Sequence, residues 1–310
     1  MASPTVVIVN PESNGGRTRK RWPSLAGRLR DAVGELEIVE TDGPGGGERA
    51  AREAARAGAE RIVVVGGDGS LSEAATGVID EGFGDRVSLG WLPMGTGCDF
   101  GRTVGVSRDP ETAIAALARG ARRRVDVGAI TFEGEGGVER TRFFLNVASF
   151  GLSGLTDLHV ARAGRTFGPT AAFLIGSLRA IRDFEPPCIA LDVDGEQVFE
   201  GEVAMVVAAN GRYFGSGMKI APEAEVDDGL LTVLVVARMA KPRLVANLPS
   251  LYRGTHVSHP AVSVRSGKRV TARTLRGEAL LDVDGEPLGA LPATIEIVPS
   301  ALELFGVDAP

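Results

Sequence analysis

The chain up to Gly120 alternates short apolar runs with segments whose apolar residues recur every three or four positions. The apolar runs predict buried strands at residues 5–9, 36–40, 61–65 and 87–92. The helical spacing falls between them, from Trp22 to Val33 and from Leu71 to Ile79. Asp109-Pro110-Glu111 begins a further helix, which we expect to end near Gly120. This alternation predicts an α/β domain with a doubly wound, mostly parallel sheet.

The pattern changes near residue 125, where short β-rich runs separated by Asp-Gly and glycine-rich turns begin. Helical patterns interrupt them at residues 153–183 and 241–252. This spacing predicts a larger, β-rich, antiparallel sandwich-like C-terminal domain. We therefore expect one domain over residues 1–125 and a second over 126–299. The expected strands are residues 126–132, 142–147, 189–193, 198–209, 230–236, 261–265, 270–273, 279–283 and 294–298.

Composition excludes several classes of function. A net charge of −6 and a pI near 5.3 argue against a protein that wraps nucleic acid. Two cysteines, Cys98 and Cys188, and three histidines form neither a disulfide framework nor a zinc motif, so a reducing cytoplasm is expected. No apolar stretch has the length of a transmembrane segment, and no N-terminal signal is apparent. We expect a cytoplasmic protein that at most touches a membrane surface.

Two glycine-rich loops carry the strongest chemical signal. Gly66-Gly67-Asp68-Gly69-Ser70 follows one predicted strand, and Gly95-Thr96-Gly97-Cys98-Asp99-Phe100 follows another. In doubly wound sheets, ligands bind beyond the carboxyl ends of strands, and glycines let backbone amides converge on an anion. An aspartate there repels a phosphate unless a divalent cation lies between them. Two such loops therefore indicate a metal-bound polyphosphate, most simply Mg-ATP.

Each loop also has a structural interpretation that needs no ligand. Ser70 and Glu73 fit a capping box, and Asp99 fits a helix N-cap. Neither loop matches the dinucleotide fingerprint or the P-loop. Residues 10–16, which include Asn10 and two glycines, form a third and weaker candidate for the same crevice.

A heptapeptide nearly repeats in the β-rich part, at residues 191–197 (LDVDGEQ) and 281–287 (LDVDGEP). Asp-Gly between two strands is a strong signal for a two-residue hairpin, which explains both copies without a ligand. A carboxylate in either copy would also suit as the proton acceptor in phosphoryl transfer. The residues alone do not separate the two copies.

The ordered set of motifs resembles the diacylglycerol kinase catalytic domain family, which includes bacterial lipid kinases and sphingosine kinases. The resemblance rests on Asn10-Pro11 with Gly15-Gly16 and on the two glycine-rich loops. It continues through residues 146–151, 211–222 and 227–231 to Asp284-Gly285-Glu286, and so covers nearly the whole chain. In that family the C-terminus returns to the nucleotide domain, which here implies residues 300–310.

The resemblance implies a role for each matching position. Asp284 and Glu286 would form the catalytic acidic pair, with one of them as general base. A structural Mg²⁺ would be held by Asp228 with backbone oxygens of Glu225 and Leu230. Asp68 and Asp99 would serve the phosphate and metal network. The implied ATP-binding residues are Asn10, Pro11, Glu12, Ser13, Asn14, Thr41, Gly66, Gly67, Asp68, Gly69, Ser70, Leu71, Ser72, Glu73, Gly95, Thr96 and Asp99.

The chain departs from the family pattern at three positions. Ser70 stands where threonine is usual, and Cys98 replaces the usual asparagine before Asp99. Cys98 is either a tolerated small residue, the interpretation we favour, or a redox-active thiol. Arg17 follows Gly15-Gly16 where some bacterial members have lysine, and a guanidinium is a cation of different shape.

Taken together, these features predict an ATP-dependent lipid kinase that transfers the γ-phosphate of Mg-ATP to a lipid hydroxyl. Diacylglycerol, which would give phosphatidic acid, is the leading acceptor. A sphingoid base or another lipid alcohol, a soluble acceptor as in NAD kinases, and a catalytically weak nucleotide or lipid sensor remain the alternatives. A homodimer through exposed strand edges is a further expectation.

The surface that would meet a membrane is less clear from the sequence. Arginines alternate with apolar residues over 153–183, which suits either an anionic bilayer or a helix with a buried apolar side. We favour the second interpretation. The residues concerned are Arg162, Arg165, Phe167, Phe173, Leu174, Ile175, Leu178, Arg179 and Arg182. Tyr213, Phe214 and Met218 either line an acceptor groove or pack in the core.

Overall fold

The computed structural model describes residues 4–163 and 169–307, which form two compact units. Unit 1 comprises Met1–Val127 and Pro299–Pro310, and unit 2 comprises Gly128–Val298. Two strands, β5 (Arg122–Glu133) and β15 (Ala293–Phe305), pass from one unit into the other. Two residues of the stretch in which arginines alternate with apolar residues, Arg165 and Phe167, lie outside the described residues. The side chains of Arg162 and Phe173 lie outside them as well.

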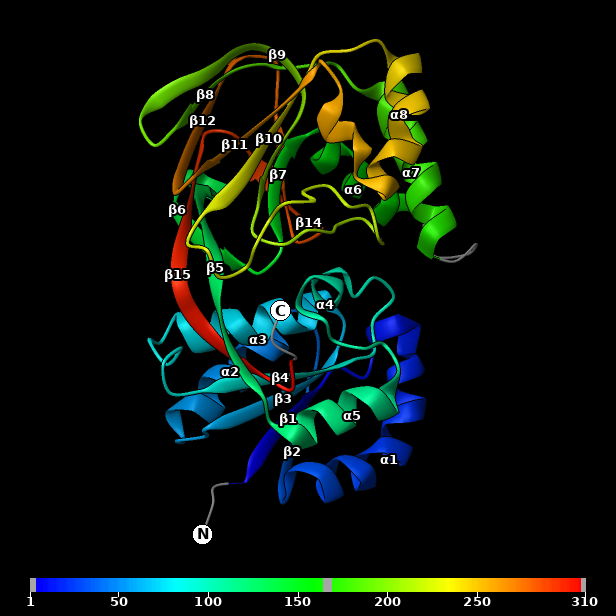
Figure 1. Cartoon of the computed structure of the whole chain (residues 1–310), viewed down its shortest axis with the longest axis vertical. Helices are drawn as coiled ribbons and strands as arrows, with labels where there is room; N and C mark the ends of the chain where they lie inside the picture. Colours follow the sequence, from blue (N-terminus) through cyan, green and yellow to red (C-terminus); the bar gives the residue numbers. More distant parts are fainter. Residues whose placement is uncertain (1–3, 164–168, 308–310) are drawn as a thin grey trace. The chain divides into compact units, whose positions relative to one another are not determined.

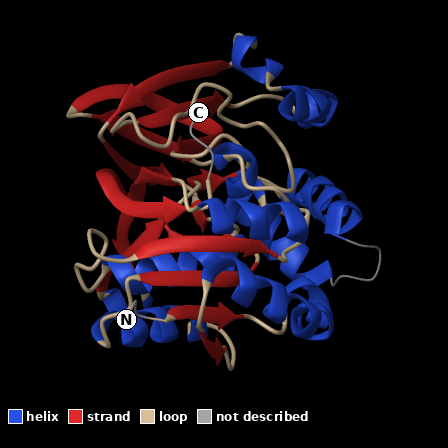
Figure 2. Cartoon of the chain, turned by 60° about the horizontal axis from the view of Figure 1, so that its bottom comes forward, coloured by secondary structure: helices blue, strands red, loops and turns tan. Residues whose placement is uncertain are grey.

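Unit 1 is built on a parallel sheet with the strand order β2-β1-β3-β4-β15. Helices cover both of its faces, with α1 and α5 on one side and α2 and α3 on the other (Figure 1), and Figure 2 shows the same layering. The elements are β1 (Thr5–Val9), α1 (Ser13–Val33), β2 (Leu36–Glu40), α2 (Gly46–Arg56), β3 (Arg61–Gly66), α3 (Asp68–Ile79), β4 (Ser88–Pro93), α4 (Asp99–Val104) and α5 (Pro110–Arg119).

The sequence pattern explains why these elements form. Every residue of β1 is buried, whereas the edge strand β2 is mostly exposed. Helix α5 begins as expected, because the Asp109 carboxylate accepts a hydrogen bond from Thr112 N at 2.9 Å, and it ends at Gly120 in the left-handed conformation. Helix α2 was not expected, since its buried residues are only glycine and alanine and give no strong apolar period.

Unit 2 is a β-rich unit whose helices α6, α7 and α8 gather on one side of its strands (Figure 1). It contains the second part of β5 and the first part of β15. Its other elements are η1 (Glu135–Gly137), β6 (Glu139–Phe144), β7 (Val147–Gly151), α6 (Leu152–Ala163), α7 (Pro169–Asp183), β8 (Cys188–Val193), β9 (Glu196–Ala209), β10 (Leu231–Ala237), α8 (Lys241–Arg253), η2 (Thr255–Ser258), β11 (Val262–Gly267), β12 (Arg269–Arg276), β13 (Leu280–Val283) and β14 (Glu286–Ala290).

The long strand β9 organises unit 2. Its first half pairs with β8, and its second half pairs with β7 on one edge and β10 on the other, all antiparallel. One apolar cluster includes Phe144, Phe150 and Leu191, and a second includes Val207 and Leu234. The expected fold class is therefore confirmed: an α/β part with a mostly parallel sheet precedes a β-rich, antiparallel part.

Two expectations for unit 2 are corrected in detail, and one strand was missed. The run at 142–147 is not one strand, because β6 ends at Phe144 and β7 begins at Val147. The helical stretch at 153–183 is two helices, α6 and α7. Strand β14 was not expected, because it contains Pro287 and Gly289, and proline and glycine within a run argue against a strand. Among the described helices, none is both long enough and apolar enough to cross a bilayer.

Candidate functional site

The three N-terminal loops lie together at the carboxyl ends of adjacent strands in unit 1. Strand β1 lies beside β3, and β3 beside β4, all in parallel. The Asn10 side chain donates to Ser70 Oγ at 2.9 Å, which joins the loop after β1 to the loop after β3. Met94 N donates to the Gly66 carbonyl at 2.8 Å, which joins the loops after β3 and β4. The three motifs, which are separate in the sequence, thus form a single cluster in the structure.

The glycines of the two main loops have a packing role of their own. A Cβ on Gly95 would lie 2.4 Å from Gly67 Cα, so the two backbones approach more closely than any larger residue allows. A Cβ on Gly66 would lie 2.6 Å from Ser70 Cβ. Close approach of the loops therefore accounts for part of the glycine content, independently of any ligand.

Asp68 and Asp99 flank Gly97. A Cβ on Gly97 would lie 3.3 Å from Asp68 Oδ2 and 3.7 Å from Asp99 Oδ2. Asp68 Oδ1 accepts from Phe100 N at 3.1 Å, and Asp99 is buried with Arg102 Nε 3.3 Å away. Burial raises the pKa of Asp68, and hydrogen bonds from backbone amides oppose the rise. Two carboxylates at one loop junction favour the approach of a cation.

Cys98, which directly precedes Asp99, is buried in the left-handed conformation, with φ 50°. Burial, with the Asp68 charge nearby, raises the pKa of its thiol to about 12. The thiol therefore stays protonated at neutral pH, and a protonated buried thiol is a poor nucleophile. This geometry fits the small-residue interpretation of Cys98.

Several expected ATP-binding residues have defined partners within unit 1. Glu73 accepts from Gly45 N and Gly47 N, both at 2.9 Å, and so caps helix α2. The capping-box interpretation is wrong, because α3 already begins at Asp68. Leu71 and Ser72 are buried in α3, and Thr41 N donates to the Val9 carbonyl at 2.9 Å.

The loop after β1 has an unusual backbone. Asn14, Gly15 and Gly16 are all left-handed, with φ of 54°, 64° and 78°. Pro11 is buried, whereas Glu12 is exposed and pairs with Arg19. Ser13 Oγ donates to the Asn10 carbonyl at 3.0 Å. The Thr96 side chain is exposed, and its carbonyl accepts from Arg108 at 2.9 Å.

The two Asp-Gly repeats of unit 2 both form two-residue hairpins. The first hairpin, Asp194-Gly195, joins β8 to β9, and the second hairpin, Asp284-Gly285, joins β13 to β14. Asp284 accepts hydrogen bonds from the backbone amides of Leu145, Asn146 and Val147 at 3.0, 3.1 and 2.9 Å. Its carboxylate thus anchors the hairpin to the turn between β6 and β7.

Glu286 follows the second hairpin and differs from Asp284 in its exposure and partner. Its Oε2 accepts from Arg142 at 2.6 Å, and 44% of its side chain is exposed. A carboxylate needs a free lone pair and access to solvent or substrate to take a proton. Of the two acidic residues, Glu286 meets this requirement better.

The expected metal residues lie on the loop between β9 and β10. Asp228 Oδ1 accepts from Leu230 N at 2.9 Å, and the side chains of Glu225 and Asp228 are exposed. In the described part of the chain, no three His, Cys, Asp or Glu side chains gather closely enough to hold a metal ion. One carboxylate with two backbone carbonyls is nevertheless a hard-oxygen donor set that suits Mg²⁺.

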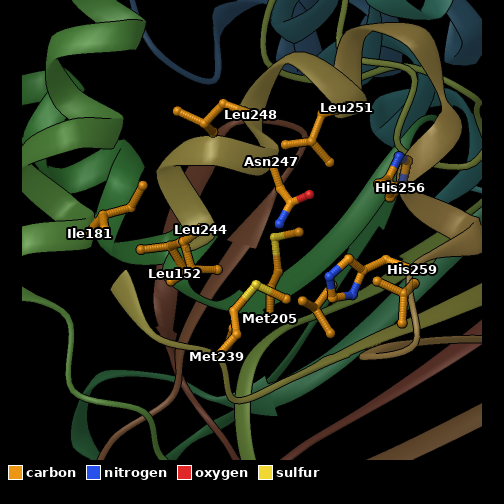
Figure 3. A pocket seen from close by; sticks show the side chains of 13 residues that line it. Leu152, Ile181, Met205, Met239, Leu244, Asn247, Leu248, Leu251, His256 and His259 are labelled. Carbon is orange, nitrogen blue, oxygen red and sulfur yellow. The ribbon is translucent and has the colours of Figure 1, made fainter. Parts of the chain in front are cut away.

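Unit 2 also contains an apolar cavity that the sequence did not reveal. Ten of its thirteen lining residues are apolar, and none is Asp, Glu, Lys or Arg. Figure 3 shows Leu152, Met205, Met239 and Leu244 around it. The lining residues are Leu152, Ile181, Ala204, Met205, Val236, Met239, Leu244, Asn247, Leu248, Leu251, His256, His259 and Val262.

The sequence signal for this cavity lies in helix α8. Leu244, Leu248 and Leu251 recur at helical spacing, yet none of the helix's residues is buried. Burial lowers the pKa of the cavity residue His256, which hydrogen-bonds the Ile220 carbonyl through Nε2 at 2.9 Å. Tyr213, Phe214 and Met218 are not among the lining residues, and Met218 is buried in the core.

Unit 1 thus brings strand-end loops with two aspartates together, an arrangement that suits phosphoryl transfer, and unit 2 contains an apolar cavity. Two family models match this chain: "Diacylglycerol kinase catalytic domain" over residues 4–130 and "YegS C-terminal NAD kinase beta sandwich-like domain" over residues 146–306. Together they span nearly all of it.

Relatives and solved structures agree. The chain is 26% identical to a diacylglycerol kinase of Staphylococcus carnosus (strain TM300), over 96% of this chain and 94% of that one. It is 27% identical to a diacylglycerol kinase of Staphylococcus saprophyticus, over the same shares. The fold matches the crystal structure of a diacylglycerol kinase from Bacillus anthracis strain Sterne with TM-score 0.73 at 22% identity, covering 97% and 96% of the two chains.

The chain therefore belongs to the diacylglycerol kinase catalytic domain family. It is a lipid kinase, and kinases of this family use ATP.

Proposed function

We propose that this lipid kinase transfers the γ-phosphate of Mg-ATP to the free hydroxyl of diacylglycerol at a membrane surface. The product would be phosphatidic acid, a phospholipid precursor. Relatives named diacylglycerol kinase along almost the full chain support this choice of acceptor.

The apolar cavity of unit 2 is the observation that carries the proposal. Its uncharged lining, with Leu152 from α6, Met205 from β9 and Leu244 from α8, suits acyl chains and gives no counter-charge for a soluble, phosphorylated acceptor. Burial keeps His256 neutral in the cavity wall. A lipid acceptor is therefore favoured over the soluble acceptor of an NAD kinase.

The loop cluster of unit 1 is the proposed nucleotide site. The glycine-rich backbone around Gly67 and Gly95 would approach the phosphates, and Asp68 and Asp99 would face the cation that accompanies them. Magnesium, if bound there, would neutralise phosphate charge. A second, structural Mg²⁺ would be held by Asp228 with main-chain oxygens of Glu225 and Leu230.

Glu286 is the proposed general base. The acceptor oxygen forms a bond to the γ-phosphorus while the bond from that phosphorus to the β–γ bridging oxygen breaks, and ADP leaves. The acceptor's hydroxyl proton passes to the Glu286 carboxylate. Arg142, 2.6 Å from Glu286 Oε2, would fix the direction of that carboxylate. Asp284 would hold the hairpin in place.

Helices α7 and α8 form the proposed membrane-facing surface. Leu174 and Leu178 on α7 and Val245 and Tyr252 on α8 are 40–51% exposed. The two helices carry five Arg or Lys residues against one acidic residue, whereas the whole chain has a charge of −6. Exposed apolar residues among basic ones suit an anionic bilayer. Since α8 also lines the cavity, this face would admit the lipid.

The test is transfer of labelled γ-phosphate from Mg-ATP into mixed micelles that contain total lipid extract. Wild type would be compared with Glu286→Gln and with the matched control Glu196→Gln, which follows the first hairpin. Labelled phosphatidic acid from wild type and Glu196→Gln, but not from Glu286→Gln, would support the proposal. A different labelled lipid would name another acceptor. No labelled lipid despite measurable ATP binding would overturn the proposal in favour of a soluble acceptor or a sensor.

A further inference from the structure

The apolar cavity of unit 2 has three polar lining residues, Asn247, His256 and His259. Figure 3 shows the Asn247 amide and the His259 ring pointing toward the middle of the cavity. A polar group in an apolar wall costs free energy unless it has a hydrogen-bond partner. The partners of these three side chains therefore indicate which of them would meet a ligand.

The two histidines use their ring protons differently. His256 Nε2 lies 2.9 Å from the Ile220 carbonyl, and because a carbonyl only accepts, this nitrogen carries the proton. Burial lowers the pKa of His256, so its one ring N–H is used within the chain. His259 Nδ1 accepts from Ala261 N at 3.1 Å, which leaves the ring proton on Nε2. No described residue accepts a hydrogen bond from His259 Nε2.

His259 is held in place where η2 meets β11. Its backbone N–H donates to the His256 carbonyl at 2.9 Å, and its carbonyl accepts from Val262 N at 2.8 Å. Together with the bond from Ala261 N, these contacts fix the backbone and the ring. A donor that is fixed before binding loses little conformational freedom when a ligand arrives.

Asn247 supplies a second donor from helix α8. It recurs at helical spacing with Leu244, Leu248 and Leu251, and it is the polar position in that apolar series. Its Nδ2 donates to the Arg243 carbonyl at 2.8 Å. An amide nitrogen carries two protons, so one N–H remains without a partner among the described residues. The cavity thus has two N–H donors for a ligand.

These donors indicate the class of lipid that the cavity would take. Two N–H groups in an apolar wall suit a ligand that combines apolar chains with acceptor oxygens. An ester carbonyl is such an acceptor, and diacylglycerol has two acyl esters. A sphingoid base and a dialkyl ether lack the carbonyl, so the donors would lose their partners beside them. The ammonium of a sphingoid base would also find no Asp or Glu among the described lining residues.

We propose that His259 Nε2–H and the remaining Asn247 Nδ2–H donate to ester carbonyls of the lipid acceptor, so that the cavity selects acyl-ester lipids over sphingoid bases and ether lipids. The inference rests on the proposed function, because it assigns the lipid of that reaction to this cavity. Both side chains determine specificity by binding the lipid away from its reacting hydroxyl. Loss of either donor should therefore raise KM and leave kcat nearly unchanged.

The experiment compares two lipids that differ in their carbonyls. Dioctanoylglycerol is the ester, and the matched dioctyl ether of glycerol keeps the free hydroxyl but has no carbonyl. Both would be measured with Mg-ATP in mixed micelles, and wild type should have the lower KM for the ester. His259→Phe and Asn247→Leu should each raise KM for the ester about 3- to 10-fold, the effect of one hydrogen bond, and leave KM for the ether unchanged.

Two further variants separate loss of the donor from a change in packing. His259→Gln keeps a side-chain N–H, so it should retain the lower KM for the ester. His159→Phe is the matched control outside the lining residues, since His159 Nε2 lies 3.4 Å from Asp183. It should keep the wild-type preference. Unchanged turnover of the ether would show that each variant is folded.

The outcomes distinguish this inference from the proposed function. An ester preference that His259→Phe and Asn247→Leu reduce, and that His259→Gln retains, supports the inference. Equal KM values for the two lipids in wild type, or an unchanged preference in both variants, overturn it.

A failure of the proposed function would be seen separately. If wild type phosphorylates neither lipid, the proposed acceptor fails. Calorimetric binding of the ester and the ether to the same proteins then decides the inference. Tighter binding of the ester that is lost in His259→Phe and Asn247→Leu supports it, and equal binding of the two lipids to wild type overturns it.

Discussion

The two Asp-Gly hairpins of unit 2 share six of seven residues, yet their surroundings differ. Asp194 and Asp284 are both left-handed, with φ of 51°, and both accept from backbone amides of a neighbouring segment. The residues on either side diverge: Asp282 is buried against Ser149, whereas Asp192 is half-buried opposite Thr271. The turn chemistry that the two copies share is thus structural, and the neighbouring strands are what distinguish them.

The largest expected effect separates Glu286 from Glu196. Glu286→Gln should lower kcat by about 10²- to 10⁴-fold, the usual contribution of a general base, with ATP affinity unchanged. Glu196→Gln should keep wild-type kcat. Initial rates of diacylglycerol phosphorylation and equilibrium binding of ATP would measure both. Equal activity in the two variants would contradict the assignment of the base.

A second experiment tests what the two hairpins have in common. Asp284→Asn replaces one acceptor oxygen by an N–H donor that faces backbone amides, which should lower the free energy of unfolding by about 1–3 kcal/mol. Asp194→Asn should lower it less, because Asp194 is exposed. Urea unfolding would measure both values.

Turnover adds a functional contrast to the same two variants. Asp284→Asn should reduce kcat by displacing Glu286, while Asp194→Asn should leave it unchanged. An inactive Asp194→Asn beside an active Asp284→Asn would reverse the roles of the two hairpins.

The hairpins also show how far sequence reasoning extends. Asp-Gly between apolar runs predicted both turns, because that dipeptide has strong left-handed preferences of its own. Two distant residues distinguish the copies, Arg142 and Ser149. Arg142 is 144 positions from its partner Glu286, and Ser149 is 133 positions from its partner Asp282. No local pattern carries such pairings.

The same limit applies to the two units as wholes. The strands of unit 1 were predictable because the parallel strands β1, β3 and β4 are almost entirely buried and form continuous apolar runs. The positions of the three loops could then be predicted, because each loop begins where one of these strands ends. The cavity of unit 2 was not predictable, because Leu244 and Leu251 on α8 have the same spacing whether they meet a core or an empty space.

The smallest expected effect concerns Arg142, which distinguishes the second hairpin through its ion pair with Glu286. Arg142→Met should retain the apolar stem, remove the 2.6 Å contact and lower kcat by roughly tenfold through loss of orientation. The matched control is Arg269→Met, which removes the 2.6 Å pair with Glu296 near the first hairpin and should leave kcat unchanged. Stability should change little in either variant, because exposed ion pairs contribute about 0–1 kcal/mol.

A double variant of Arg142→Met with Glu286→Gln should show no further loss of kcat beyond Glu286→Gln alone, because Arg142 acts on the reaction only through that carboxylate. An additive loss in the double variant would mean that Arg142 contacts the substrate itself.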